Sequence, residues 1–565
     1  QRGAGSEAPG VVLALLVGDR SLIPPWAERL YQRAGTFHVI VISGAHVGLV
    51  AWFLYGGLRW LGLDQRPALV CLLVALPMYA WVCGGRPSVV RAVAMGVAVV
   101  GTRLLSLEVC LVNGLALAAL FLLALRPQDL RDPGFQLSFL ATAAIVGLAS
   151  PLARRLRARL GRLGPLLAVS LAAQMAVLPV SAWHFQRLTP GAIVASLLAM
   201  PLALGSILAG ALLVVVGPIP WLSAGVARMA LLAVGGLTLS SRAVVGLPGG
   251  SVPVPRPGTL WMTAYLLALT AALLSRGARR WSGVAVTVLL TLALVWSPQP
   301  KGVAEMRLTV LDVGHGDALF LELPDGARLL VDGGGSYNRS FDIGEDVVVP
   351  YLLRRGVRGL DAVILTHSDL DHLGGLLGVV SRLRVREIWE GGSSWDRRSY
   401  RELRARALER GVKVRRLSAG EERTFGEVRL EILAAGGASS DPGNNDSVVL
   451  RLCYGKSKIL LTGDAERQLE EHLLRWGGPL GADVLKVGHH GSRSSTTPAF
   501  LEAVRPRLAL ISTGASGPFR LPSARVLHRL RARDVTCLRT DRDGAITLRF
   551  DRQGRIRVRT YTNER

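Results

Sequence analysis

Apolar stretches long enough to cross a lipid bilayer fill the first 300 residues, and they constrain this chain more than any other feature. A helix of about 17–25 apolar residues spans the hydrocarbon core, and Gly or Pro within such a stretch is typical of broken or re-entrant helices. We count about ten, at roughly 40–61, 67–83, 89–105, 109–125, 134–150, 164–182, 191–216, 221–246, 259–275 and 281–296. The sequence therefore predicts a polytopic α-helical membrane domain of about ten helices over residues 1–300.

The composition of the chain supports this division. Half of the residues are hydrophobic and only 19% are charged, with a mean hydropathy of +0.36, whereas soluble domains carry about 25% charged residues. This excludes an ordinary soluble enzyme and a disordered chain. After the linker Ser297–Gly302 the sequence becomes mixed in charge and contains short β-like runs between Gly, Asp and Asn. We therefore expect a second domain over residues 301–565.

The charge and cysteine content narrow the chemistry. The net charge is +25, and it comes mostly from Arg, whose guanidinium groups bind phosphates and carboxylates in pairs of hydrogen bonds; an Arg-rich composition is equally typical of a high-GC genome. No C-x-x-C occurs among the five cysteines, which excludes a cysteine-type zinc site. The chain starts at Gln1 without a signal peptide, so we expect a fragment that lacks its natural N-terminus.

Arginine clusters predict the orientation of the membrane domain. Arg154–Arg162 lies between the fifth and sixth apolar stretches, and Arg276–Arg280 lies between the ninth and tenth. Positively charged loops remain on the cytoplasmic side, and an even number of spans separates the two clusters. The tenth span then leaves the cytoplasm, so we expect residues 305–565 on the outer side of the membrane.

This topology places three polar patches at the outer face of the membrane domain. Ionisable groups in spans are costly and indicate function, although each patch alone has a structural explanation in helix packing, a helix start or an N-cap. Three patches on one face favour a pathway for a polar substrate. The candidate channel residues are Ser43, His46, Arg86, Ser88, Arg91, Asp132 and Gln136.

The strongest motif of the second domain follows a β-like run at 362–365. Two His and two Asp occur within six residues, at His367, Asp369, Asp371 and His372. Imidazole and carboxylate groups together suit divalent metals, and the glycines that follow allow a helix to start close by. The segment therefore predicts a metal site.

Three further segments support a site of this kind. Asp464 ends a β-like run, as expected of a bridging ligand, and the pair His489 and His490 lies at a strand-to-loop turn. The region around 444–447 offers substrate-binding or ligand groups. Each segment has a weak signal alone, but their order and spacing are specific. The candidate substrate-binding residues are Asn444, Asn445, Ser447, Lys486 and Ser492.

Together these residues resemble the metallo-β-lactamase superfamily, whose fold is an αββα sandwich with a metal site at its edge. The segment 367–372 is similar to its H-x-H-x-D-H motif, with Asp369 where a second His is common. The resemblance implies a divalent cofactor, Mn²⁺ or Zn²⁺, as one or two ions. It implies a first metal position at His367 and Asp369, and a second at Asp371 and His372.

By the same resemblance Asp464 bridges the two positions, and either His489 or His490 completes the second. The third-motif His of two-metal members has no counterpart; Asn445 or Asp446 lies in that region. A metal-activated water suits attack on a phosphodiester, and Asp371 or Asp464 is the candidate catalytic group that accepts its proton.

The whole architecture resembles the ComEC family of DNA-uptake competence proteins. The resemblance covers nearly the whole chain and includes Ile42–Leu49, Arg86–Ser88 and Asp132–Phe139 besides the metal motifs. His315 stands where the family usually has Gln. The family's N-terminal helices and small β-barrel domain are absent from this sequence.

That resemblance implies a channel in the bacterial inner membrane that imports one strand of transforming DNA while the other strand is degraded. Its partners would be single-stranded DNA, membrane lipid, a DNA receptor and a cytosolic ATP-driven translocase. The translocase would be a separate protein because this sequence has no Walker-type motif for ATP binding. Nine cations between Arg397 and Arg416 suit contacts to the DNA backbone or a solvated helix equally well.

Three functions remain open from the sequence. The first is a DNA channel with a working nuclease domain. The second is the same channel with a metal-binding but catalytically weak domain that acts as a gate or scaffold. The third is a membrane-anchored metallo-hydrolase without transport, against which the polar patches in the membrane domain argue, because a mere anchor does not need ten spans.

Overall fold

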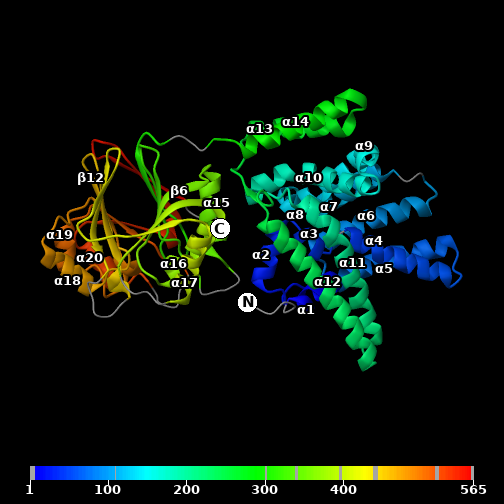
Figure 1. The fold of residues 1–565 in the computed structure, drawn as a ribbon, viewed down its shortest axis with the longest axis horizontal. Coiled ribbons are helices and arrows are strands. Elements are labelled where there is room, and N and C mark those ends of the chain that lie inside the picture. Colours follow the sequence, from blue (N-terminus) through cyan, green and yellow to red (C-terminus); the bar gives the residue numbers. More distant parts are fainter. Residues whose placement is uncertain are drawn as a thin grey trace. The chain divides into compact units, whose positions relative to one another are not determined.

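The computed structural model describes residues 7–42, 44–107, 110–298, 302–336, 341–392, 397–436, 443–515 and 521–561. The chain divides into two compact units, residues 1–297 and 298–565 (Figure 1). The first unit is built almost entirely of helices and the second of two sheets and their covering helices.

Unit 1 is a bundle of mostly apolar helices with one short pair of strands, β1 (Arg187–Leu188) and β2 (Val252–Pro253). Its helices are α1 (Ala8–Val17), α2 (Pro25–Ala34), α3 (Phe37–Ile40), α4 (Gly44–Trp60), α5 (Gln65–Val82), α6 (Pro87–Leu104), α7 (Leu111–Leu125), α8 (Pro133–Ala144), α9 (Ser150–Leu160), α10 (Leu163–Phe185), α11 (Ala192–Val216), α12 (Pro220–Gly246), α13 (Thr259–Leu274) and α14 (Gly277–Val295).

The helices confirm a multi-pass membrane protein, but fewer of them reach full spanning length than the predicted ten. Among the described residues, seven helices are long and apolar enough to cross a membrane, with α8 and α9 joined as Pro133–Leu160. The helices α4, α7 and α13 form at predicted apolar stretches but have only 17, 15 and 16 residues. The helix α4 is therefore at the lower limit of spanning length, and α7 and α13 are below it, because polar or Gly-rich turns end these helices.

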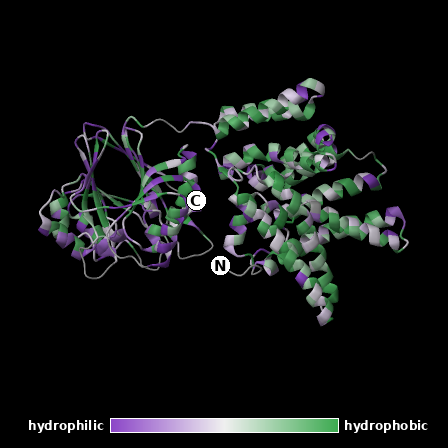
Figure 2. Cartoon of the chain, in the orientation of Figure 1, coloured by the Kyte–Doolittle hydropathy of each residue, from purple (hydrophilic) through white to green (hydrophobic). Residues whose placement is uncertain are grey.

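Hydrophobic residues predominate along the helices of this bundle (Figure 2), and many large apolar side chains are exposed. Trp60 and Leu260 are 85% and 87% exposed, which suits contact with lipid. Inside the bundle, Ala168, Ala172 and Ala176 recur every fourth residue of α10 and are fully buried. Such small residues let helix backbones approach closely, and this packing stabilises helix pairs in lipid.

Unit 2 is a sandwich of two sheets, and it confirms the predicted αββα architecture. The eight-stranded sheet has the order β17 (Ile556–Tyr561), β16 (Ala545–Phe550), β3 (Met306–Val310), β4 (Leu319–Glu322), β5 (Arg328–Val331), β6 (Gly359–Leu365), β7 (Arg384–Glu390) and β8 (Lys413–Arg416). The seven-stranded sheet has the order β15 (Thr536–Arg539), β14 (Leu508–Ile511), β13 (Val484–Lys486), β12 (Ser457–Leu461), β11 (Val448–Tyr454), β10 (Val428–Ala435) and β9 (Glu422–Phe425).

Apolar residues on alternate strand positions fill the space between the two sheets. Leu308, Leu450 and Leu548 are fully buried members of this core, as the period of two along a strand requires. Helices cover the outer faces (Figure 1). The eight-stranded sheet carries α15 (Val349–Arg354), α16 (Leu370–Arg382) and α17 (Arg398–Glu409), and the other sheet carries α18 (Arg467–Trp476), α19 (Pro498–Val504) and α20 (Ala524–Arg531), while the short α21 (Thr540–Asp543) precedes β16.

Each sheet contains four adjacent parallel strands, and this positions the site. Strands β5 to β8 run parallel, as do β12 to β15. The carboxyl ends of parallel strands meet at one edge of a sheet, where loops gather functional groups. The two edges touch there, because the amide of Val448 donates to the carbonyl of Thr366 at 2.9 Å.

Candidate metal centre

Four side chains from three segments converge at this common edge. Asp371 and His372 lie in the first turn of α16, Asp464 follows β12, and His490 follows β13. One ligand atom of each lies within 4.8 Å of the others. The Nε2 atom of His490 is 3.5 Å from Oδ2 of both Asp371 and Asp464, and Nε2 of His372 is 3.2 Å from Oδ2 of Asp464. This arrangement is a candidate site for a divalent cation.

Unsatisfied polar atoms at the same place test whether these residues fit a cation. The Nε2 atoms of His367, His372 and His490 and Oδ1 of Asp464 are buried and have no hydrogen-bond partner among the described residues. Leaving a polar atom buried and unpaired costs free energy, and imidazole nitrogen with carboxylate oxygen is a donor set for zinc or manganese. The residues therefore fit a divalent metal.

A second layer of groups orients the imidazole rings. Nδ1 of His372 lies 2.7 Å from Oδ2 of Asp332, whose carboxylate also accepts hydrogen bonds from the amide and hydroxyl of Thr366 at 2.8 and 2.6 Å. Nδ1 of His490 donates to the carbonyl of Ser512 at 2.9 Å. Contacts of this kind fix the tautomer and leave Nε2 free to bind a metal.

Charge compensation beneath the cluster comes from one buried lysine. The Nζ atom of Lys486 forms an ion pair with Asp317 and donates to the carbonyl of Gly463 at 2.9 Å. Lys486 is 1% exposed, so the side chain predicted to contact substrate instead lies inside the protein. Burial alone would lower its pKa, but Asp317 and Asp464 raise it, and the residue remains a cation that holds Asp317 in place.

Opposing effects set the protonation of the two neighbouring histidines. Burial lowers the pKa of His367 to about 3, and His372 adds to this effect, so His367 is neutral and able to bind a metal. Burial also disfavours a charged His372, yet the carboxylates of Asp464 and Asp332 raise its pKa well above the ordinary value. A metal that binds at His372 therefore competes with a proton.

The backbone is strained where the last ligand lies. His489 and His490 both have positive φ, 45° and 51°, a region that costs non-glycine residues about 1–3 kcal/mol each. Gly316 has φ of 122° and approaches so closely that a Cβ there would collide with the carbonyl of Asp371. Strain and close approach of this kind are concentrated at functional sites.

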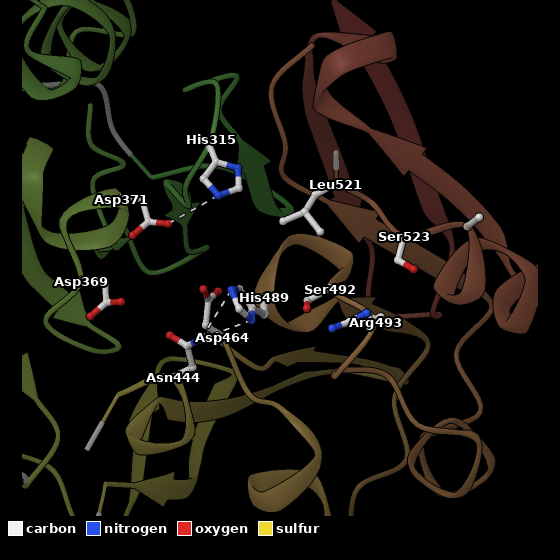
Figure 3. Close-up of a pocket in the computed structure, with 11 residues that line it drawn as sticks. His315, Asp369, Asp371, Asn444, Asp464, His489, Ser492, Arg493, Leu521 and Ser523 are labelled. Carbon is white, nitrogen blue, oxygen red and sulfur yellow. Dashed lines mark hydrogen bonds and ion pairs between the residues drawn. The ribbon is translucent and has the colours of Figure 1, made fainter. Parts of the chain in front are cut away.

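The cluster opens into a cavity of about 570 Å³ (Figure 3). Asp371 lies beside His315, whose Nε2 is 3.8 Å from its Oδ2. Arg493 lies on the side of Ser492 and Ser523. The cavity therefore combines carboxylates with one guanidinium group. Its lining residues are His315, Asp369, Asp371, Asn444, Asp464, His489, Ser492, Arg493, Leu521, Ser523 and Ala524.

The predicted first metal position is only partly assembled. His367 lies beside His372, with ring centroids 4.1 Å apart. Asp369 lies outside the four-residue cluster, and its Oδ1 forms an ion pair with Arg397 at 2.8 Å. Burial raises the pKa of Asp369 although Arg397 opposes this. The chain thus pairs one predicted ligand of the first position with an arginine.

The two adjacent histidines have different roles in the structure. His490 belongs to the cluster, whereas His489 lines the cavity with its Nδ1 2.5 Å from Oε1 of Glu466. The hydrogen bond to His489 lowers the pKa of Glu466. Burial would lower the pKa of His489, but Glu466 and Asp464 raise it. The sequence left open which of the two histidines is the metal ligand, and the geometry favours His490.

The predicted substrate-binding residues divide into two groups. Asn444 and Ser492 line the cavity, and the amide of Asn444 donates to Glu466 at 3.3 Å. Asn445 instead accepts hydrogen bonds from two amides at the start of α18, each at 3.2 Å. Ser447 accepts a hydrogen bond from the amide of Asp464 at 3.0 Å. Asn445 and Ser447 therefore hold the loops beside the cavity and are not among the residues that line it.

Several residues of the site were missed from the sequence. Asp317, Asp332 and Glu466 carry the contacts that hold the ligands and the lysine, yet each follows a strand or lies in a loop with ordinary turn residues. The first two belong to segments, 311–318 and 331–334, that frame the motif. Asp332 directly follows β5, whereas Asp317 lies in the loop between β3 and β4, so only Asp332 had a signal from its position after a β-like run.

In the membrane unit, the structure joins two of the three polar patches. Arg91 is 7% exposed, and its guanidinium lies 3.4 Å from Oδ1 of Asp132, 41 positions away. Asp132 also caps α8 by accepting from the amide of Phe135 at 2.7 Å. Patches that are distant in sequence therefore meet as one ion pair.

The remaining candidate channel residues have separate surroundings. Arg86 lies 3.7 Å from Asp19, and Gln136 donates to the carbonyl of Leu130 at 2.9 Å. His46 is buried near the start of α4 and Ser88 is half-buried near the start of α6. Ser43 lies outside the described residues.

Comparison with known proteins gives two family matches. Residues 15–279 match the family described as Competence protein, and residues 311–515 match the Metallo-beta-lactamase superfamily. The chain is 29% identical to ComE operon protein 3 of Bacillus subtilis, over 96% of this chain and 72% of that protein. It is 28% identical to Competence protein ComA of Neisseria gonorrhoeae, over 98% and 77%, and 27% identical to Uncharacterized protein YcaI of Escherichia coli, over 96% and 71%.

Proposed function

Since this chain joins a membrane domain of the competence protein family to a domain of the metallo-β-lactamase superfamily, we propose that it takes up DNA. Unit 1 conducts a single strand across the bacterial inner membrane. Unit 2 hydrolyses phosphodiester bonds of the strand that is not imported. The observation that carries the catalytic part is the convergence of Asp371, His372, Asp464 and His490 within 4.8 Å.

The proposed hydrolysis divides its tasks among the residues of the cavity. When bound, a divalent cation supplies Lewis acidity toward a phosphoryl oxygen and lowers the pKa of water. Asp371 and Asp464 lie on the cavity wall, where either carboxylate accepts the proton of the attacking water. Arg493 binds the phosphate, and Asn444 and Ser492 orient the chain of the nucleic acid.

The cofactor is proposed to be Mn²⁺ or Zn²⁺. The four-residue cluster supplies one complete set of donors, with two carboxylates and two imidazoles. A second ion at His367 and Asp369 requires Asp369 to leave Arg397. We therefore expect one ion to bind at the cluster and any second ion to bind more weakly.

The proposed route through the membrane uses the polar patches of unit 1. The ion pair of Arg91 with Asp132 and the polar starts of α4, α6 and α8 lie at the predicted outer face. The arginines at 154–162 and 276–280 support a cytoplasm on the opposite side. Unit 2 then lies outside the inner membrane, and the partners are a DNA receptor outside and an ATP-driven translocase in the cytosol.

A second candidate function is a gate without strong catalysis. The ion pair between Asp369 and Arg397 and the lack of a third-motif His both weaken the first metal position. In that case unit 2 would bind metal and DNA and control entry to unit 1, and it would leave phosphodiester bonds intact.

One experiment separates these two functions. The full chain in detergent is incubated with end-labelled double-stranded DNA and Mn²⁺ or Zn²⁺, beside Asp371→Ala. We expect cleavage by the wild type and its loss, by about 10³-fold or more, in the variant. Exposed Glu409 provides a matched control, Glu409→Ala, which should cleave like the wild type. DNA binding without cleavage by the wild type would favour the gate.

A further inference from the structure

An unusual row of charges crosses the eight-stranded sheet of unit 2. Arg557 of β17 lies directly opposite Arg549 of β16, and Arg549 lies directly opposite Arg307 of β3. The row continues with Glu322 and Arg328 on β4 and β5. Directly opposite residues lie about 4.5–5.5 Å apart, and like charges there destabilise a sheet. A bound anion would therefore stabilise the two successive Arg–Arg pairs.

The carboxylate of Glu322 compensates the inner part of this row. Glu322 accepts hydrogen bonds from Arg307 at 3.0 Å and from Arg355 of α15 at 2.8 and 3.0 Å. Burial raises the pKa of Glu322 although Arg307, Arg328 and Arg549 oppose this. Glu322 is thus already shared by two guanidinium groups, and it leaves the outer end of the row uncompensated.

The outer arginines have no ion pair within the described part of the chain. Arg549 is half-buried, and Arg557 and Arg559 are exposed on β17, the edge strand of the sheet. The basic helix α17 is different, because Arg404 pairs with Glu390 and Arg406 with Glu402. The outer arginines of the sheet are therefore a candidate for anion binding in addition to the arginine-rich segment.

An aromatic ring lies beside the same arginines. Tyr561 is 43% exposed, and it shares a face of β17 with Arg557 and Arg559 because alternate residues of a strand point the same way. The guanidinium of Arg559 lies 4.8 Å from the centroid of its ring. Arginines with an exposed aromatic side chain are the combination that binds single strands, through phosphate contacts and base stacking.

We propose that Arg549, Arg557, Arg559 and Tyr561, here called the arginine ladder, bind the backbone of single-stranded nucleic acid. The inference rests on DNA being the substrate of the chain, and it adds a binding site apart from the cavity. Arg328, in the same row, precedes Asp332 by four residues along β5, a distance of about 13 Å. The ladder holds one part of a strand while the metal centre acts on another.

The test uses a substitution with opposite effects on binding and stability. Arg549→Glu places a carboxylate between Arg307 and Arg557, so opposite charges replace like charges. For the full chain in detergent with EDTA, we expect the affinity for a fluorescein-labelled oligothymidylate to fall about tenfold by anisotropy. The slope of log affinity against log salt should shrink by about 0.7 for each cation removed. The melting temperature of unit 2 should rise by about 1–3 °C.

The control has the same charge change elsewhere. Arg531→Glu changes an exposed arginine at the end of α20, and it should leave the affinity within about twofold. Unchanged affinity in Arg549→Glu, or equal losses in both variants, would overturn the ladder. If Arg549→Glu instead loses only its affinity for short-chain phosphatidylglycerol, the ladder binds lipid and the proposal is wrong.

A separate measurement of catalysis allows the binding test to be interpreted even if the proposed nuclease activity is absent. Hydrolysis of bis(p-nitrophenyl) phosphate with Mn²⁺ reports the metal centre alone, because this small diester does not reach the ladder. We expect Arg549→Glu to retain that activity. An inactive wild type would reject the nuclease, yet the binding comparison would still decide whether the ladder exists.

Discussion

The two units treat buried polar groups in different ways. In unit 2 the metal centre gathers charged groups from many strand ends, and Lys486, Asp317 and Asp332 surround the ligands with compensating contacts. In unit 1 buried polar groups form short, isolated chains, such as Glu7 to Thr238 at 2.9 Å and Thr238 to Tyr31 at 2.8 Å. A dense charged cluster with unpaired ligand atoms indicates cation binding, whereas an isolated pair indicates helix positioning.

We expect the largest effect on this difference between the units when the compensating charge of unit 2 is removed. Lys486→Met leaves Asp317 buried without its ion pair, and such a loss costs about 3–5 kcal/mol. We expect unit 2 to unfold at lower denaturant while unit 1 keeps its helical signal. Circular dichroism of the full chain in detergent measures both. Exposed Lys413 provides the control variant Lys413→Met, and equal stability of the two variants would contradict the role of Lys486.

In unit 1 the corresponding change should have a smaller effect. Arg91→Met removes the partner of Asp132, but the side chain of Asp132 is 47% exposed and can be solvated. We expect a loss of about 1–2 kcal/mol, seen as a lower melting temperature of unit 1. A loss as large as that of Lys486→Met would show that the two units bury charge alike.

The sequence predicted features that depend on neighbouring residues better than features that depend on contacts between distant residues. The motif at 367–372 is local, so its histidines and carboxylates were visible without the fold. Asp317, Asp332 and Glu466 act through contacts with Lys486, His372 and His489, which are distant in the sequence, and no local pattern contains such contacts. The helix positions of unit 1 follow from hydropathy, but the lengths of α4, α7 and α13 depend on their turns, and the pairing of Arg91 with Asp132 depends on how the helices pack.

The pH dependence of metal binding sharpens the comparison within unit 2. Because the carboxylates of Asp464 and Asp332 raise the pKa of His372, its proton stabilises the metal-free fold below the unfolded pKa. That contribution is lost as pH rises through the folded pKa. Metal must displace this proton. As pH rises toward the folded pKa of His372, the apparent affinity for metal should therefore increase by up to tenfold for each pH unit. Calorimetry with Mn²⁺ at several pH values measures how the metal affinity changes with pH. An affinity that does not change with pH would contradict competition between metal and proton at His372.

The smallest expected effect belongs to the polar contacts between helices of unit 1. Ser241→Ala removes the hydroxyl that lies 2.9 Å from that of Thr36. We expect a loss of about 0.5–1.5 kcal/mol, with no change in metal content. A change in metal content would mean that the two units are coupled through this contact, which the contrast between them does not allow.

Metal content tests the central claim most directly. The full chain, purified in detergent and dialysed against Mn²⁺ or Zn²⁺, is analysed by mass spectrometry of its metals beside Asp464→Ala, with Asp541→Ala as the control. The convergence of Asp371, His372, Asp464 and His490 predicts at least one ion per chain in the wild type and the control, and its loss in Asp464→Ala. A wild type without metal, or an Asp464→Ala variant with full occupancy, would contradict the account.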